Sequence, residues 1–465
     1  MQSVNPATGA VVETFAETPR AELDGIVARV DAAFREWRCR PLAERAGPMR
    51  ALARGLRAQR EQYARTMALE MGKPIAQGEA EIEKCAWTCE FYAGHAAEFL
   101  APRERESDAA RSYVRFDPIG PVLAIMPWNF PFWQVFRFAV PGLMAGNAAV
   151  LKHASNVPRC ALEIEAAWRA AGFPPDLFRT VLVGSDAVPA LIRNPRIRGV
   201  TLTGSDRAGS AVAAEAGRAI KKTVLELGGS DPFVVLGDAD LERTARAAAD
   251  ARLVNSGQSC IAAKRFIVVE AVADRFVPRF VEEMAGRRMG DPLDRATQVG
   301  PLARRDLRDQ LHAQVEESVR RGAQLLLGGN VPDGPGAFYP PTVLAAVHPG
   351  MPAFDEETFG PVAAVIRVPN EAAAIRAAND SRYGLGASLW TADRARAERL
   401  AGEIEAGLVF VNGIVHSDAR LPFGGIKHSG YGRELSEYGI QEFCNVKTVW
   451  LGDGLSALPS THGGE

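Results

Sequence analysis

The chain has 465 residues, of which 47% are hydrophobic and 24% are charged, a globular composition that excludes disorder, collagen and coiled coil as the main architecture. This length predicts two or three domains. The formal net charge of -2 gives no excess of either sign that would indicate a nucleic acid or an anionic membrane as partner.

The N-terminus and the cysteines indicate the compartment. The segment that begins at Met1 has neither the basic region nor the apolar stretch of a signal peptide. The longest apolar run, residues 138–151, contains Pro141 and is too short to span a bilayer. The six cysteines are sparse and form no Cys-x-x-Cys pair, which is typical of a reduced protein. We therefore expect a cytoplasmic protein.

The first hundred residues are expected to be mainly helical. Apolar residues follow a helical spacing between Ile26 and Trp37, and a second helix is predicted at 81–99. Cys85 and Cys89 lie on one face of that second helix and could bind a metal. No further ligand lies at a suitable spacing, so packing in the core is the better interpretation and we expect no metal site.

From residue 111 onward, predicted strands alternate with predicted helices. The first group of strands is expected at 111–116, 121–126, 148–151, 180–183 and 199–202. Alternation of this kind predicts an α/β fold whose parallel sheet is covered by helices on both faces. Ligands of such sheets bind outside the carboxyl ends of the strands.

A second alternating stretch predicts a second doubly wound parallel sheet. Its strands are expected at 232–236, 265–269, 362–368, 387–389 and 408–411. A last strand is predicted at 446–451, and the tail at 456–465 is expected to be disordered. Neither the Gly-x-Gly-x-x-Gly nor the Gly-x-x-x-x-Gly-Lys-Ser/Thr pattern occurs, so any dinucleotide would bind in a different manner.

Cys260 is a candidate nucleophile. It ends the segment Asn255-Ser-Gly-Gln-Ser-Cys260, whose small, polar residues predict a loop. Backbone N–H groups there could bind an oxyanion, and a thiolate would be a strong nucleophile. From this context alone, a buried structural cysteine is an equally good interpretation.

Three polar residues end other predicted strands, and each has two interpretations. Glu226 is a surface charge, or a general base if apolar neighbours desolvate it and raise its pKa. Asn129, between two prolines, caps the following helix or donates its amide N–H to an oxyanion. Lys152 is a solvated lysine, or it binds ribose hydroxyls or phosphate.

Seven motifs in one order make a specific combination. They are Pro127-Trp-Asn-Phe-Pro, Lys152, Thr203-Gly-Ser205, Leu225-Glu-Leu-Gly-Gly229, Gly257-Gln-Ser-Cys260, Glu357-Thr-Phe-Gly-Pro361 and Pro422-Phe-Gly-Gly-Ile-Lys-x-Ser-Gly430. Together they resemble the NAD(P)-dependent aldehyde dehydrogenase superfamily. The resemblance runs from Val4 to the predicted C-terminal strand and thus covers nearly the whole chain.

The resemblance implies catalytic roles by position. Cys260 would attack the aldehyde to give a thiohemiacetal, with Asn129 and the Cys260 backbone N–H holding the oxyanion. Hydride transfer to the nicotinamide would leave a thioester, and Glu226 would activate the water that releases the carboxylic acid. The positions that match the family's cofactor site are Trp128, Lys152, Ser155, Gly204, Ser205, Leu227, Glu357 and Phe359.

The family fold also implies a division of the chain. A cofactor-binding domain would comprise residues 1–103 and 124–231, and a catalytic domain residues 232–440. A strand arm that pairs between subunits would comprise 104–123 and 441–465, including the tail. Another chain would cover the edge of this arm, so a homodimer or homotetramer is expected.

Ser155 bears on the choice of cofactor. NAD-preferring relatives usually have Glu three residues after the position of Lys152, and that carboxylate takes the adenosine ribose hydroxyls. Ser155 removes the repulsion of a 2′-phosphate. We therefore expect NAD or NADP as cofactor, with NADP tolerated.

Arg137 and Arg420 are the candidate substrate residues. Arg137 matches an arginine that binds the substrate carboxylate in relatives acting on succinic semialdehyde, although a helix-surface salt bridge is the alternative. Other members have a second arginine where this chain has Val254, and Arg420 could supply that charge. Some relatives have a Cys-x-Cys pair, of which Ala262 here replaces the second cysteine.

The whole chain is most similar to a bacterial subgroup of succinate-semialdehyde dehydrogenases. The sequence therefore predicts NAD(P)-dependent oxidation of succinic semialdehyde to succinate. A broad-specificity aldehyde dehydrogenase is the main alternative, because specificity transfers loosely within a fold. The other is a catalytically retired binding protein on the same scaffold, against which the joint presence of Cys260, Glu226, Asn129 and Lys152 argues.

Overall fold

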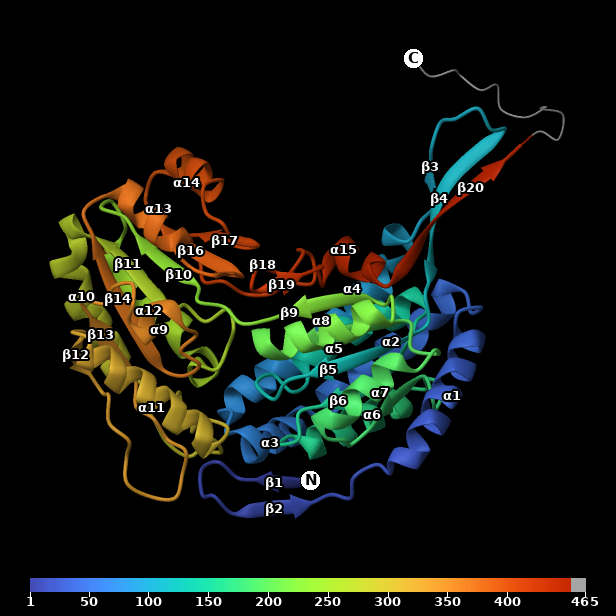
Figure 1. Ribbon diagram of the computed structural model, residues 1–465, viewed down its shortest axis with the longest axis horizontal. Helices are drawn as coiled ribbons and strands as arrows, with labels where there is room; N and C mark the ends of the chain where they lie inside the picture. The colour runs from blue at the N-terminus through green and yellow to red at the C-terminus, as the bar shows by residue number, and fades with distance from the viewer. Residues whose placement is uncertain (453–465) are drawn as a thin grey trace.

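Two twisted sheets, one of six strands and one of seven, form the frame of the molecule in the computed structural model, which describes residues 1–452 (Figure 1). Each sheet is surrounded by its own hydrophobic core. The predicted α/β architecture with two wound sheets is confirmed. The predicted disorder at 456–465 and the end of the predicted arm lie outside the described residues.

The N-terminal region begins with a hairpin and continues with four helices. Strands β1 (Gln2–Val4) and β2 (Val11–Thr14) pair antiparallel. These strands were not predicted, because they are short and mostly exposed and therefore lack an alternation of apolar residues. The helices are α1 (Arg20–Trp37), α2 (Leu42–Ala58), α3 (Arg60–Met71) and α4 (Ile75–Phe99). Cys85 and Cys89 are fully buried in α4, as expected for core residues.

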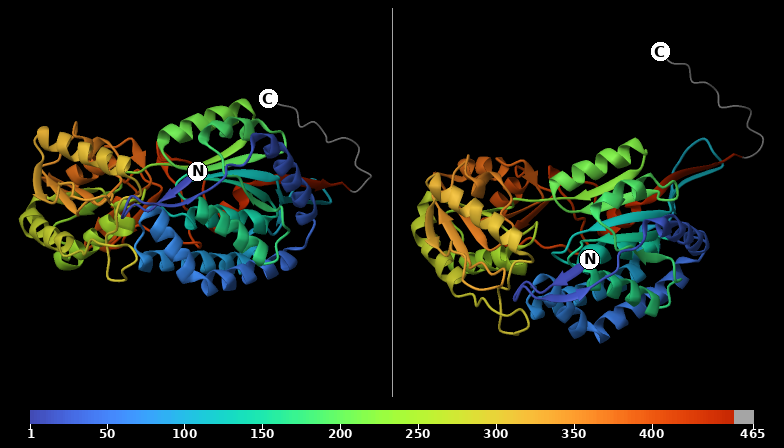
Figure 2. Two further views of the ribbon diagram at one scale, coloured as in Figure 1. Left: turned by 90° about the horizontal axis from the view of Figure 1, so that it is seen from below. Right: turned by 60° about the horizontal axis from the view of Figure 1, so that its bottom comes forward.

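The six-stranded sheet is parallel except at one edge. Its order is β19 (Gly430–Tyr431), β9 (Lys222–Glu226), β8 (Gly199–Thr203), β5 (Pro121–Met126), β6 (Ala148–His153) and β7 (Phe178–Thr180), with β19 antiparallel to β9. Helices α1 and α8 (Asp206–Arg218) cover one face (Figure 2). Helices α5 (Trp133–Ala145) and α6 (Pro158–Ala170) cover the other face, while η1 (Ser185–Ala187) and α7 (Val188–Arg193) precede β8. The central strands are apolar along their whole length because both faces are buried.

The seven-stranded sheet is also parallel except at one edge. Its order is β12 (Gln324–Leu327), β13 (Thr342–Ala345), β14 (Val362–Val368), β11 (Arg265–Val269), β10 (Pro232–Val235), β16 (Gly386–Trp390) and β17 (Leu408–Val411), with β12 antiparallel. Helices α9 (Leu241–Leu253) and α10 (Glu270–Ala285) pack together against it, and α13 (Glu371–Asn379) packs on β10, β11 and β14. The remaining elements of this half are η2 (Val254–Gly257), α11 (Arg305–Arg320), α12 (Pro352–Asp355), α14 (Arg394–Ala401) and the pair β15 (Tyr383–Gly384) and β18 (Ile426–Lys427).

The chain returns to the first unit before it ends. Gly430 of β19 pairs with Glu226 of β9, and α15 (Ser436–Glu442) packs against α4 and α5. Phe423, Leu435 and Ile440 belong to the core of the six-stranded unit. This segment therefore packs with the first unit, although the predicted range 232–440 placed it with the second.

An arm of three antiparallel strands projects from the six-stranded unit (Figure 1). It contains β3 (Arg103–Glu104), β4 (Arg111–Pro118) and β20 (Cys444–Leu451). Residues 121–123, which the predicted arm included, belong instead to β5 and pair with β6 and β8. No helix among residues 1–452 is both long and apolar enough to cross a membrane.

Candidate active site

A cavity of about 630 Å³ lies between the two units, and Cys260 is part of its wall. The six-stranded unit contributes Phe130, Trp133 and Arg137 from the start of α5 and the segment before it. The other unit contributes the segment that carries Cys260. An apolar cleft with a few polar groups is typical of a site for a small molecule.

The backbone before Cys260 has an uncommon conformation. Asn255 and Ser256 have φ angles of 52° and 56°, and Gly257 has a φ of 77°. A Cβ atom on Gly257 would lie 2.3 Å from the Gly360 carbonyl, so only glycine fits there. Left-handed backbone at non-glycine residues is strained and must be held by its surroundings.

Lys264 lies beneath this loop and is fully buried. Its Nζ donates to the carbonyl oxygens of Ser259 (3.1 Å), Cys260 (2.9 Å) and Ala262 (3.0 Å). Arg252 adds bonds from the other side, to the carbonyls of Gly257 and Ala263. The ammonium therefore fixes the turn that presents the thiol.

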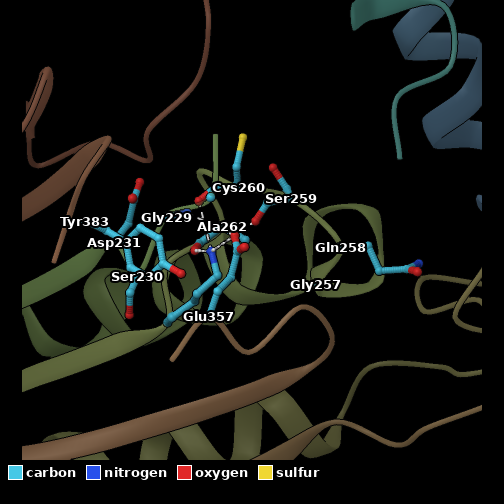
Figure 3. A network of polar contacts seen from close by, with 12 residues as sticks. Gly229, Ser230, Asp231, Gly257, Gln258, Ser259, Cys260, Ala262, Glu357 and Tyr383 are labelled. Carbon is cyan, nitrogen blue, oxygen red and sulfur yellow. Dashed lines mark hydrogen bonds and ion pairs between the residues drawn. The ribbon is translucent and has the colours of Figure 1, made fainter. Parts of the chain in front are cut away.

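The thiol of Cys260 points away from the polar network around Glu357 (Figure 3). Burial raises the pKa of the Cys260 thiol to about 12, and the positive charge of Arg137 opposes this shift. In the protein without ligands, Cys260 is therefore a protonated thiol at neutral pH.

Asn129 is buried next to the Cys260 loop. Its Nδ2 donates to the Gln258 carbonyl (3.1 Å), and Nδ2 of Asn255 donates to the Asn129 carbonyl (2.7 Å). Asn129 makes no capping bond to α5. The structure thus brings Asn129 and the loop of Cys260 together, as their predicted roles require.

Glu81 takes the place at α5 that the capping interpretation gave to Asn129. Its Oε1 accepts the N–H groups of Phe132 and Trp133, both at 2.9 Å. Its Oε2 forms an ion pair with the fully buried Lys73, whose Nζ lies 3.8 Å from the Phe130 ring centroid. The network fixes the start of α5, and no local pattern in the sequence indicated it.

Glu226 ends β9 and is 2% exposed. Within residues 1–452, neither carboxylate oxygen has a hydrogen-bond partner. Burial raises its pKa well above the ordinary value, Arg137 opposes this shift, and Glu434 adds to it. A desolvated carboxyl group of this kind is suited to take a proton near neutral pH.

Three predicted cofactor residues lie near one another. The rings of Trp128 and Phe359 are perpendicular, with their centroids 5.7 Å apart. Glu357 Oε1 accepts the Gly229 N–H at 3.0 Å and lies 3.8 Å from Lys264 Nζ. Burial raises the pKa of Glu357, and Lys264 opposes the shift.

Lys152 lies in β6, near its carboxyl end, and has no hydrogen-bond or ion-pair partner in the part of the chain that the structure describes. Burial lowers its pKa. Ser155 follows three residues later and is exposed. An unpaired ammonium beside a hydroxyl-bearing turn can receive phosphate or ribose oxygens.

The remaining predicted cofactor residues surround the start of α8. Ser205 caps this helix by accepting the Ala208 N–H at 3.3 Å, and the Gly204 N–H donates to the Glu226 carbonyl at 3.0 Å. Leu227 is buried and packs on Gly209. Among the described residues, no three His, Cys, Asp or Glu side chains are grouped so as to hold a metal ion.

Arg137 lines the cavity but is 1% exposed and forms an ion pair with Glu434. Its Nη2 donates to Thr203 Oγ1 (3.2 Å), and its guanidinium lies 4.4 Å from the Phe423 ring centroid. The alternative interpretation, a salt bridge on the helix surface, is wrong. Arg137 does form a salt bridge, but the pair with Glu434 is buried.

The structure does not bring Arg420 to the cavity wall. Its side chain is 67% exposed and binds both carboxylate oxygens of Asp418, at 2.9 and 2.6 Å. Val254, which occupies the position of the second arginine of some relatives, does line the cavity.

Lys84 in α4 lines the cavity and was not found from the sequence, whereas Ser417 lies in the loop 415–421, which was predicted to form the mouth of the substrate tunnel. Lys84 Nζ donates to Ser417 Oγ at 2.7 Å. They are separated by 333 residues, so no spacing in the sequence relates them.

Comparison with known proteins assigns the family. A model described as the aldehyde dehydrogenase family matches residues 1–449. The chain belongs to the aldehyde dehydrogenase family. This confirms the predicted enzyme class, an oxidoreductase that acts on aldehydes.

Similar proteins include two curated relatives and one solved structure. The chain is 49% identical over 449 residues to the probable succinate-semialdehyde dehydrogenase (NADP(+)) of Synechocystis, covering 97% of this chain and 99% of that protein. It is also 49% identical over 458 residues to the succinate-semialdehyde dehydrogenase (NADP(+)) of Mycobacterium avium. That match covers 98% of this chain and 97% of the Mycobacterium protein. The chain is also similar to a crystal structure of succinic semialdehyde dehydrogenase from Streptococcus pyogenes in complex with NADP+. The two sequences are 38% identical and the two structures superpose with a TM-score of 0.95. The match covers 97% of this chain and 100% of the Streptococcus chain.

Proposed function

We propose that this protein oxidises succinic semialdehyde to succinate with NADP as the acceptor. The observation that carries the proposal is the position of Cys260 in the wall of a cavity of about 630 Å³ that Arg137 also lines. The 49% identity to NADP(+)-linked succinate-semialdehyde dehydrogenases over nearly the full length supports the same substrate.

The residues present fit a nicotinamide dinucleotide. The unpaired Lys152 and the exposed Ser155 would hold the ribose and its 2′-phosphate, because no carboxylate side chain occupies position 155. Gly204, Ser205 and Leu227 would line the pyrophosphate region, where the N-terminus of α8 favours negative charge. Trp128, Glu357 and Phe359 would hold the rest of the dinucleotide. When bound, the nicotinamide accepts the hydride that leaves the substrate carbon.

The side chains of this protein supply the rest of the reaction. The Cys260 thiol loses its proton to solvent, the resulting thiolate forms a C–S bond to the aldehyde carbon, and the carbonyl electron pair moves to the oxygen. Asn129 Nδ2 and the Cys260 backbone N–H stabilise this oxyanion. Loss of hydride leaves a thioester on Sγ. Glu226 then takes a proton from water as the water attacks, the C–S bond breaks, and the carboxylic acid is released.

A broad-specificity aldehyde dehydrogenase is the second candidate, and one observation favours it. Arg137 already forms an ion pair with Glu434, and so part of its charge is compensated before any substrate enters. An arginine paired in this way discriminates less between a carboxylate and an alkyl group. We assign no role to Arg420 in either candidate function, because its side chain is exposed and forms an ion pair with Asp418.

We also propose that the protein is a homodimer or homotetramer in a reducing compartment such as the cytoplasm. Strand β20 is an edge strand of the arm and exposes Val446, Trp450 and Leu451. Such an edge is normally covered by a partner. All six cysteines are free, which suits a reducing environment.

The proposed function is tested by following NADPH formation from succinic semialdehyde and by identifying the product. We expect NADPH and succinate in equal amounts, and no activity from Cys260→Ala. Turnover without succinate, or a Cys260→Ala protein that remains active, would contradict the proposal.

A further inference from the structure

The charges on the cavity wall are almost all compensated. Four cationic side chains line it, and three have a carboxylate partner: Arg137 with Glu434, Arg287 with Asp250 at 2.9 Å, and Arg295 with Glu79 at 2.8 Å. Lys84 is the exception, because no carboxylate of residues 1–452 lies within ion-pair distance of it. The wall therefore carries one uncompensated positive charge.

The ammonium of Lys84 is held in a defined place. Its Nζ donates to Ser417 Oγ at 2.7 Å and lies 4.2 Å from the Trp133 ring centroid. Trp133 Nε1 donates to the same oxygen at 3.1 Å, so Ser417 is held from two sides. Trp133 also precedes Arg137 by one helical turn of α5. The ammonium is thus part of the same wall as Arg137.

The geometry points to Lys84 as the cation that pairs with the terminal carboxylate of the substrate. This inference rests on the proposed function, in which the substrate is a short aldehyde with a carboxylate at its far end. An uncompensated ammonium against an apolar wall favours an anion over an alkyl group, because the anion replaces the hydration that burial removes. Arg137, already paired with Glu434, then shapes the wall rather than providing the main attraction.

The electrostatics of the groups around Lys84 agree with this role. Burial, with a smaller contribution from the charge of Arg137, lowers the pKa of Lys84 to about 8, and Cys85, Glu81 and Asp418 oppose this shift. The group is charged below about pH 8 and neutral above it. The KM for succinic semialdehyde should therefore rise above pH 8, whereas the KM for butanal should not follow that titration.

The test compares kcat/KM for succinic semialdehyde and for butanal, two four-carbon aldehydes that differ in the terminal carboxylate. In Lys84→Met, we expect the preference for the semialdehyde to fall about 30-fold or more, through KM rather than kcat. Arg295→Met is the matched control, because it removes a cation of the same wall that is paired with Glu79. There the preference should change less than about threefold.

Lys84→Arg provides a second readout that does not depend on the stability of the methionine variant. It keeps the charge but does not titrate in this range, so the rise of KM above pH 8 should disappear. A Lys84→Met protein that keeps the preference, or a pH-dependent KM that survives in Lys84→Arg, overturns the inference while the proposed function stands. An unmodified protein without any preference for the semialdehyde overturns both.

Discussion

Replacing Lys264 by methionine tests how the Cys260 loop is held. Methionine keeps most of the side-chain volume but removes three hydrogen bonds to backbone carbonyls and a charge 3.8 Å from Glu357. A hydrogen bond from a charged donor contributes about 1.5–3 kcal/mol. The ammonium also costs several kcal/mol to bury, so we expect a net loss of about 2–4 kcal/mol, concentrated in this loop.

The expected effect on catalysis follows from the position of the thiol. The loop carries left-handed residues that relax when they are not held, and a misplaced nucleophile typically lowers the rate about 100-fold. We therefore expect kcat to fall about 100-fold, which corresponds to about 2.7 kcal/mol of activation free energy. The pKa of Glu357 should rise further, because the cation that lowers it is gone.

Lys221→Met is the matched control for this measurement. Lys221 is partly buried and its Nζ donates to the carbonyls of Ile192 and Asn194, but it is not part of the cavity. Both variants should show a lower thermal unfolding temperature, and only Lys264→Met should lose kcat. If folded Lys264→Met keeps kcat within about threefold of the unmodified protein, the idea that Lys264 positions the nucleophile is refuted.

Three further predictions concern single groups of the site. With a thiol pKa of about 12, alkylation of Cys260 in the ligand-free protein should rise about tenfold per pH unit from about pH 7 to 9; a plateau near pH 9 would contradict the raised pKa. Glu226→Gln cannot accept a proton, so steady-state turnover should fall about 100-fold or more while the first turnover still forms NADPH. Loss of that first turnover would place Glu226 before the thioester. Ser155→Glu should lower the NADP/NAD ratio of kcat/KM at least about tenfold by charge repulsion, and an unchanged ratio would exclude a 2′-phosphate at this position.

Buried strands could be predicted well from the sequence because both of their faces must be apolar. The predicted bounds of the buried strands β5, β11 and β14 agree with the structure, and so do those of the partly buried edge strand β17. The edge strand β12 was missed, since its leucines are largely exposed, and its neighbour β13, which has only four residues, was missed although it is buried. The pattern of apolar residues along a strand indicates which of its faces are buried, and it is therefore weakest for edge strands, which are poorly buried.

The candidate site was predicted where its residues stand in ordered motifs, such as the segment ending at Cys260. Its supporting residues were missed because their partners are distant in the chain. Lys84 meets Ser417 across 333 residues, and Glu81 meets the start of α5 across 51. Arg137 was found as a substrate candidate, but its pairing with Glu434 was not, because the alternation of strands and helices does not predict which loops meet.

The most direct test of the proposed substrate is the ratio of kcat/KM for succinic semialdehyde to that for butanal, measured with NADP on the unmodified protein. We predict a preference of about 100-fold or more, equal to about 2.7 kcal/mol, because the proposed carboxylate site lies in the cavity that Cys260 lines. Similar values for the two aldehydes would contradict a carboxylate site and leave a general aldehyde dehydrogenase.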